Sequence, residues 1–65
     1  MMENHIAKRR KAAGYTQRSL CDLLGWQLRR LQTYERGERM PSTLDALILA
    51  DALGCTVADL FQLKK

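Results

Sequence analysis

The sequence has 65 residues, of which 46% are apolar and 28% are charged, and its formal net charge is +4. A chain of this length builds one small core, so we expect a single domain over residues 1–65 and exclude a multidomain enzyme. Residues 1–10 contain no signal-peptide stretch and no apolar run has the length of a membrane span, so we expect a cytoplasmic protein without membrane contact.

The positive charge is concentrated in the first part of the chain. Residues 1–40 contain nine Lys or Arg and four Asp or Glu, whereas residues 41–65 contain two and three. Such a basic excess is typical of nucleic-acid binding proteins. A solvated basic surface is the alternative, so the spacing of other residues has to decide.

Four glycines divide the chain into five segments of helical type. Gly14, Gly25, Gly37 and Gly54 each follow a stretch long enough for a helix, and glycine is the usual residue at a left-handed helix end. Alternation with a period of two is absent and β-branched residues are few, so we expect no strands. The pattern predicts an all-α fold of five helices.

Most of the expected helices follow a hydroxyl side chain that can cap them. Thr16, Ser42 and Thr56 are favoured N-cap residues, whereas Gln27 is a poor one. We expect helices over about residues 2–13, from 17, from 28, over 43–53 and from 57 to near 63.

The segment from Gln17 to Arg36 has the pattern of two helices that cross at a steep angle. Such a crossing needs a small side chain at the contact, a glycine at the turn and apolar anchors on the second helix. Cys21, Gly25, Leu31 and Tyr34 meet these needs in order. We therefore predict a helix-turn-helix at about residues 17–36.

Three segments resemble motifs of the phage repressor and Cro family of helix-turn-helix proteins, also called the xenobiotic-response-element family. They read GYTQRSLCDLLGW, LQTYERGERMPS and ADALGCTVADLF, and the resemblance extends over residues 5–63. It implies a compact five-helix domain of the lambda-repressor type that binds double-stranded DNA. The chain departs from the family at Cys21, where alanine is common, and at Gln27, where Ser, Thr or Asp is usual.

The third expected helix carries the candidate DNA-reading side chains. With Leu31 and Tyr34 turned inward, a step of about 100° per residue puts polar residues on the opposite side. The start of a recognition helix faces base edges in the major groove, where arginine suits guanine and glutamine suits adenine. An extension of the core is the alternative for the leucine of this set. We expect base contacts from Leu28, Arg29, Gln32 and Thr33.

Contacts with phosphate are expected on both sides of this helix. The resemblance implies that Gln17, at the start of the second helix, binds a phosphate with help from the helix dipole. It also implies backbone contacts in the loop after the third helix, for which a solvated loop is the alternative. We expect phosphate contacts from Thr16, Gln17, Arg30, Arg36, Arg39 and Ser42.

Arg10 and Glu35 are expected to form a structural salt bridge. Arg10 lies on the inward stripe of the first helix with Ile6 and Ala13, and Glu35 lies at the end of the third helix. The resemblance implies that the two side chains pair, partly buried, and set the angle of the recognition helix.

The fourth expected helix is apolar on nearly every side. A small monomer cannot cover such a helix, so we expect a homodimer with Leu44, Ile48 and Leu63 in its interface. An apolar monomer surface is the alternative.

The sequence contains no catalytic or metal-binding pattern. His5 is the single histidine, and Cys21 and Cys55 are interpreted as small core residues. We therefore expect no enzyme activity, small-molecule substrate, metal or cofactor. The leading hypothesis is a sequence-specific DNA-binding transcriptional regulator, a repressor that binds a pseudo-palindromic operator as a homodimer. The alternative is a protein-interaction module on the same fold, such as an antitoxin or a subunit of a larger complex.

Overall fold

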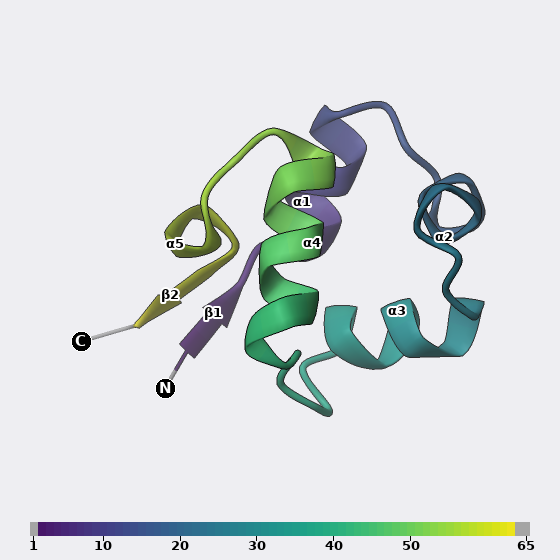
Figure 1. Cartoon of the computed structure of the whole chain (residues 1–65). Helices are drawn as coiled ribbons and strands as arrows, with labels where there is room; N and C mark the ends of the chain where they lie inside the picture. Colours follow the sequence, from purple (N-terminus) through teal and green to yellow (C-terminus); the bar gives the residue numbers. More distant parts are fainter. Residues whose placement is uncertain (1, 64–65) are drawn as a thin grey trace.

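Five helices and two short strands form the part of the chain that the computed structural model describes, residues 2–63 (Figure 1). The elements follow in the order β1 (Met2–Asn4), α1 (Ile6–Ala12), α2 (Gln17–Leu24), α3 (Leu28–Glu35), α4 (Thr43–Leu53), α5 (Val57–Leu60) and β2 (Phe61–Leu63). The mostly helical fold with five helices agrees with the prediction.

Each helix contributes one fully buried side chain to a shared core. Burial of a side chain of this size stabilises a protein by about 1.5–3 kcal/mol. The five side chains belong to one hydrophobic cluster, so the position of each helix depends on its packing against the others. They are Ile6, Leu20, Leu31, Leu49 and Leu60, each 0% exposed.

The starts of α2, α4 and α5 coincide with their capping hydroxyls. Thr16, Ser42 and Thr56 each accept a hydrogen bond from the backbone N–H three residues later, at 3.0, 3.1 and 3.1 Å. Gln27 makes no such bond to α3, so the prediction of a poor cap is confirmed. Gly25 ends α2 at φ 71°, a conformation that a residue with a β-carbon adopts only with strain.

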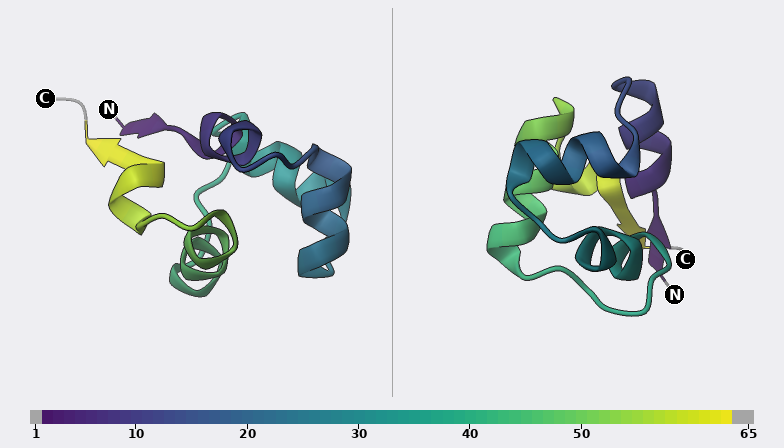
Figure 2. Two further views of the ribbon diagram at one scale, coloured as in Figure 1. Left: turned by 90° about the horizontal axis from the view of Figure 1, so that it is seen from above. Right: turned by 90° about the vertical axis from the view of Figure 1, so that its right-hand side faces the viewer.

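Helices α2 and α3 cross steeply. In Figure 1, α2 is seen end-on while α3 runs across the view, and Figure 2 shows the same crossing from two other sides. Cys21 lies at the contact, where its thiol donates to the carbonyl of Gln27 with an Sγ–O distance of 3.8 Å. Burial raises the pKa of this thiol. A small side chain is needed here because a larger one would push the start of α3 away from α2.

The two strands correct the expectation that the chain has none. Strand β1 pairs antiparallel with β2, with Asn4 opposite Phe61. The first helix therefore begins at Ile6 instead of near residue 2, and the fifth ends at Leu60 instead of near Leu63. Strands of three residues are too short to show an alternating pattern, and each is formed by pairing with the far end of the chain.

Asn4 explains why α1 begins where it does. Its side-chain Oδ1 accepts a hydrogen bond from the backbone N–H of Ile6 at 2.9 Å, and its Nδ2 donates to the carbonyl of Tyr34 at the end of α3. The backbone N–H of His5 donates to the carbonyl of Leu60 at 2.8 Å. The chain before α1 is thus tied to α3 and α5 and leaves the helical path.

Candidate nucleic-acid interface

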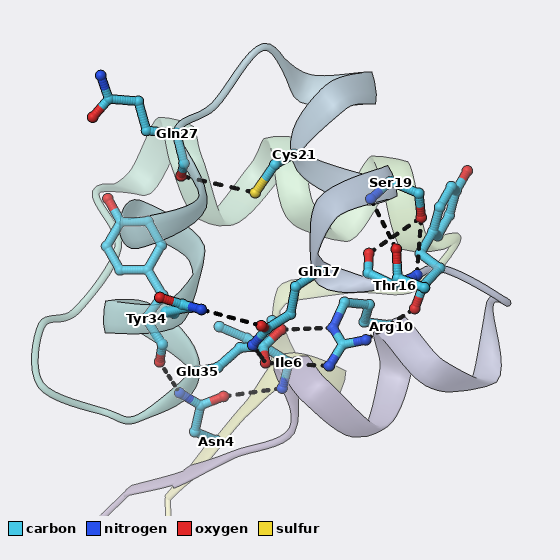
Figure 3. A network of polar contacts seen from close by, with 12 residues as sticks. Asn4, Ile6, Arg10, Thr16, Gln17, Ser19, Cys21, Gln27, Tyr34 and Glu35 are labelled. Carbon is cyan, nitrogen blue, oxygen red and sulfur yellow. Dashed lines mark hydrogen bonds and ion pairs between the residues drawn. The ribbon is translucent and has the colours of Figure 1, made fainter.

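A buried salt bridge joins α1 to the end of α3 (Figure 3). Arg10 Nε donates to Glu35 Oε2 at 2.8 Å, Arg10 Nη1 donates to the carbonyl of Tyr15 at 2.9 Å, and the two charged side chains are only 9% and 7% exposed. The structure thus brings the expected pair together. Ala13, expected on the same inward stripe, is exposed instead, because α1 ends at Ala12 and Ala13 belongs to the turn.

The carboxylate of Glu35 also receives a donor from α2. Gln17 Nε2 donates to Glu35 Oε1 at 2.9 Å, and Gln32 Nε2 donates to Gln17 Oε1 at 3.4 Å. A chain of polar contacts therefore runs from Arg10 through Glu35 and Gln17, which Figure 3 shows, to the half-buried Gln32 of α3. The hydrogen bond between Gln17, an expected phosphate contact, and Gln32, an expected base contact, fixes the position of one side chain against the other.

A hollow of 450 Å³ lies against the exposed face of α3. Arg29 is exposed on this face, and its carbonyl accepts a hydrogen bond from the Thr33 hydroxyl at 2.8 Å. The hydroxyl of Thr33 is therefore used within the helix. Arginines from α3 and from the following loop give the hollow a positive charge. Its lining residues are Gln27, Arg29, Arg30, Thr33, Tyr34 and Arg39.

Leu28 is divided between the core and the surface. It is half-buried and packs against the core cluster. It also lines a second hollow, of 630 Å³, together with Thr16 and Gln17 at the start of α2. The core contact, left open as an alternative, is observed, and a base contact by Leu28 stays a prediction.

Arg30 has a partner within the protein, which differs from the expected phosphate contact. Its guanidinium pairs with the carboxylate of Asp45 on α4, and its Cζ lies 4.4 Å from the centre of the Trp26 ring. The Tyr34 hydroxyl donates to the same Asp45 oxygen at 2.6 Å, and the Tyr34 and Trp26 rings meet edge to face at 5.8 Å. We call these four residues, Trp26, Arg30, Tyr34 and Asp45, the Arg30 anchor.

Asp45 is a buried acidic residue, and its side chain is only 6% exposed. The hydrogen bonds from Arg30 and then from Tyr34 lower its pKa, although burial alone would raise it. The same pairing raises the pKa of Arg30. Both groups are therefore charged at neutral pH.

The other residues expected at phosphates lie on the surface. Arg36, Arg39 and Ser42 are exposed. Arg36 Nη1 is 3.8 Å from Glu38 Oε1, but both side chains are more than half exposed, at 64% and 57%, so this ion pair is weak. Within residues 2–63 no ion pair holds Arg39, so its exposed guanidinium is accessible to an anionic partner.

Gln27 was not expected at the interface, yet it lies beside the residues that were. Its side chain is exposed, makes no capping bond and points away from the protein (Figure 3). It lines the same hollow as Arg29. The signal in the sequence is an amide at the start of the expected recognition helix, where side chains face base edges.

Large apolar side chains remain exposed on α4. Leu44 and Leu47 are 66% and 54% exposed, whereas Ile48 is half-buried. The side chain of Leu63, also expected in a dimer interface, lies outside the described part of the structure. Beside α4 is an apolar groove of 320 Å³, lined by Met40, Pro41, Thr43, Ala46, Leu47, Val57 and Phe61.

Two steeply crossed helices, packed on a helical core and exposing an arginine-bearing face of the second, define a helix-turn-helix protein. A family model described as helix-turn-helix matches residues 6–60. The chain belongs to the phage repressor and Cro type of this helix-turn-helix family, as its motifs predicted. It is a DNA-binding regulatory domain at the level of the family, which is not typically enzymatic. No curated protein matches the chain, and none of the helices within residues 2–63 is long and apolar enough to cross a membrane.

The buried salt bridge predicts a large stability loss for Glu35→Gln. The substitution leaves the Arg10 charge buried without its counter-ion, which costs about 3–5 kcal/mol. Urea unfolding followed by circular dichroism measures the change. The matched control is Glu38→Gln in the exposed pair with Arg36, where a change within about 0.5 kcal/mol is expected. Equal, small effects of the two substitutions would contradict this assignment.

The lowered pKa of Asp45 predicts a pH-dependent contribution to stability. A carboxyl with a lower pKa in the folded than in the unfolded state stabilises the protein above its unfolded pKa, about 3.9, and this contribution is lost as the pH falls through the folded pKa. Asp45→Asn should therefore lower the melting temperature at neutral pH, and the difference from the unchanged protein should shrink below about pH 4. Thermal unfolding over a pH series measures it; a difference that does not vary with pH would count against the pair.

Proposed function

We propose that this protein is a sequence-specific transcriptional regulator, a repressor that occupies a pseudo-palindromic operator as a homodimer. Family membership supports DNA binding, and the single observation that carries sequence specificity is the cationic hollow on α3. It is lined by the exposed Gln27 and Arg29 at the start of α3 and by the half-buried Thr33 further along a helix that Glu35 fixes to Arg10. A cytoplasmic location goes with this proposal.

Base edges are read by the start of α3 in the major groove. Arg29 donates to O6 and N7 of a guanine, a pair worth about 1–3 kcal/mol of discrimination. Gln32, braced by Gln17, suits an adenine, while the Thr33 methyl and the exposed part of Leu28 suit a thymine methyl. The Thr33 hydroxyl is already bonded to the carbonyl of Arg29, and this supports a contact through the methyl group.

Phosphates are bound on both sides of α3. On one side lie Thr16 and Gln17, at the start of α2, where backbone N–H groups and the helix dipole favour an anion. On the other side lie Arg36, Arg39 and Ser42, which are exposed in and next to the loop before α4. Contacts of this kind orient the recognition helix and carry no sequence information themselves.

The homodimer forms through the exposed apolar side chains of α4. Leu44 and Leu47 lie three residues apart on one face of the helix, and Ile48 adds a half-buried side chain beside them. A two-fold axis next to this face presents two recognition helices to successive major grooves, about 34–36 Å apart. Leu63 remains part of the proposed interface.

A protein-interaction module on the same fold is the second candidate, and the apolar groove beside α4 favours it. An antitoxin or a subunit of a larger complex would use such a groove to hold another protein. The salt dependence of binding separates the candidates, because phosphate contacts release counter-ions and contacts between apolar surfaces do not.

DNA binding should weaken steeply with salt. A dimer that contacts about six to ten phosphates loses about 10³–10⁵ in affinity between about 50 and 200 mM salt. Fluorescence anisotropy with duplexes selected from a random DNA pool measures this loss.

Arg29→Ala should relax the preference at one base position by about 1–3 kcal/mol, whereas Arg36→Ala should weaken binding to all sequences alike. If the unchanged protein binds no duplex at low salt, the proposed function is wrong.

Dimerisation should depend on the exposed leucines of α4. Leu44→Glu puts a charge into the proposed interface, so the dimer should dissociate at micromolar concentration in sedimentation equilibrium. Leu23→Glu is the matched control, because Leu23 on α2 is 59% exposed and outside the interface. A monomeric protein before substitution, or dissociation by both variants, contradicts the proposed interface.

A further inference from the structure

We infer that Arg30 is an internal anchor of the recognition helix and not a DNA contact, and that Asp45 is a positioning residue for DNA reading. The inference rests on the proposed function, because it concerns how α3 is held while it reads bases. It also replaces the phosphate contact expected for Arg30 from the sequence.

Arg30 is held on two sides by the protein. Its guanidinium pairs with the Asp45 carboxylate, and the Trp26 ring lies 4.4 Å from its Cζ, the geometry of a cation–π contact. The side chain of Arg30 is 45% exposed, whereas that of Asp45 is 6% exposed. If Arg30 turned to a phosphate, it would leave the largely buried Asp45 carboxylate without its counter-ion, so the internal pair is favoured over the DNA contact.

Asp45 binds two successive turns of the recognition helix. Arg30 and Tyr34 are four residues apart, hence on one face of α3, and both donate to the same oxygen, Asp45 Oδ2. Asp45 is itself fixed in the first turn of α4, where its backbone N–H donates to Ser42 Oγ at 3.1 Å and the helix dipole favours a negative charge. Any rotation of α3 about its axis would break both bonds.

The recognition helix is therefore tied to two other helices through separate carboxylates. Glu35 ties its end to Arg10 on α1, and Asp45 ties its middle to α4. Asp45 follows Leu44, a residue of the proposed dimer face, directly in the chain. The angle between α3 and α4, and with it the geometry of two recognition helices on one operator, depends on the Arg30 anchor.

The salt dependence of DNA binding tests whether Arg30 contacts phosphate. The matched pair is Arg30→Gln and Arg36→Gln, measured on one mixed-sequence duplex by anisotropy. We expect Arg36→Gln to reduce the slope of log affinity against log salt by about 0.9 per contact, and Arg30→Gln to leave the slope unchanged. A reduced slope for Arg30→Gln overturns the inference, whatever happens to stability.

Thermal unfolding tests the anchor without DNA. Arg30→Gln should lower the melting temperature, since it strands the Asp45 carboxylate, whereas Arg36→Gln should leave it unchanged. Adding Asp45→Asn to Arg30→Gln should restore part of the loss, because the stranded charge is removed. An unchanged melting temperature for Arg30→Gln, or losses that simply add in the double variant, overturns the anchor.

A third measurement separates positioning from mere stability. Well below the melting temperature of every variant, Asp45→Asn should lower the affinity ratio of a selected site to the mixed-sequence duplex several-fold. A merely structural role lowers the melting temperature and leaves this ratio unchanged, and that result overturns the positioning role. If the unchanged protein binds no DNA, the proposed function fails, while the unfolding experiment still decides whether the anchor exists.

Discussion

The orientation of α3, the proposed recognition helix, depends first on the buried pair of Arg10 and Glu35. An ion pair removed from water is stable only when its remaining polar atoms are bonded, and here Tyr15 and Gln17 complete the set. Helix α3 has eight residues, and a helix so short does not persist on its own in water. Its geometry is therefore a property of its contacts, and this pair is the most buried of its charged contacts.

A helix that reads bases must present its side chains at a fixed angle. Here, structural residues and residues that line the hollow alternate along α3: Leu31 enters the core, Tyr34 and Glu35 bind other elements, and the exposed Arg29 and the half-buried Thr33 line the hollow. The division follows from a period of 3.6 residues, which lets one short helix serve the core with one face and a ligand with the other. The hydrogen bonds from Gln32 through Gln17 connect the two faces.

The parts of the fold that follow local rules were predictable from the sequence. Thr16, Ser42 and Thr56 mark helix starts because capping involves residues three apart. The pairing of Arg30 with Asp45 was not predictable, because many surface acids could have met that arginine and only the packing of α3 on α4 selects one. The strands were missed for the same reason, since Asn4 meets Phe61 only after the helices between them have folded. The base contacts of the residues on α3 stay predictions, because no pattern within the protein chain identifies the base that a side chain binds.

The pairing of β1 with β2 has a practical consequence for work with this protein. Both strands lie on the side of the domain opposite α2, as Figures 1 and 2 show from different directions. A fluorophore or an immobilisation tag joined beyond either strand would thus leave from the same region, remote from the turn between α2 and α3. Such a handle would therefore leave the turn between α2 and α3 uncovered.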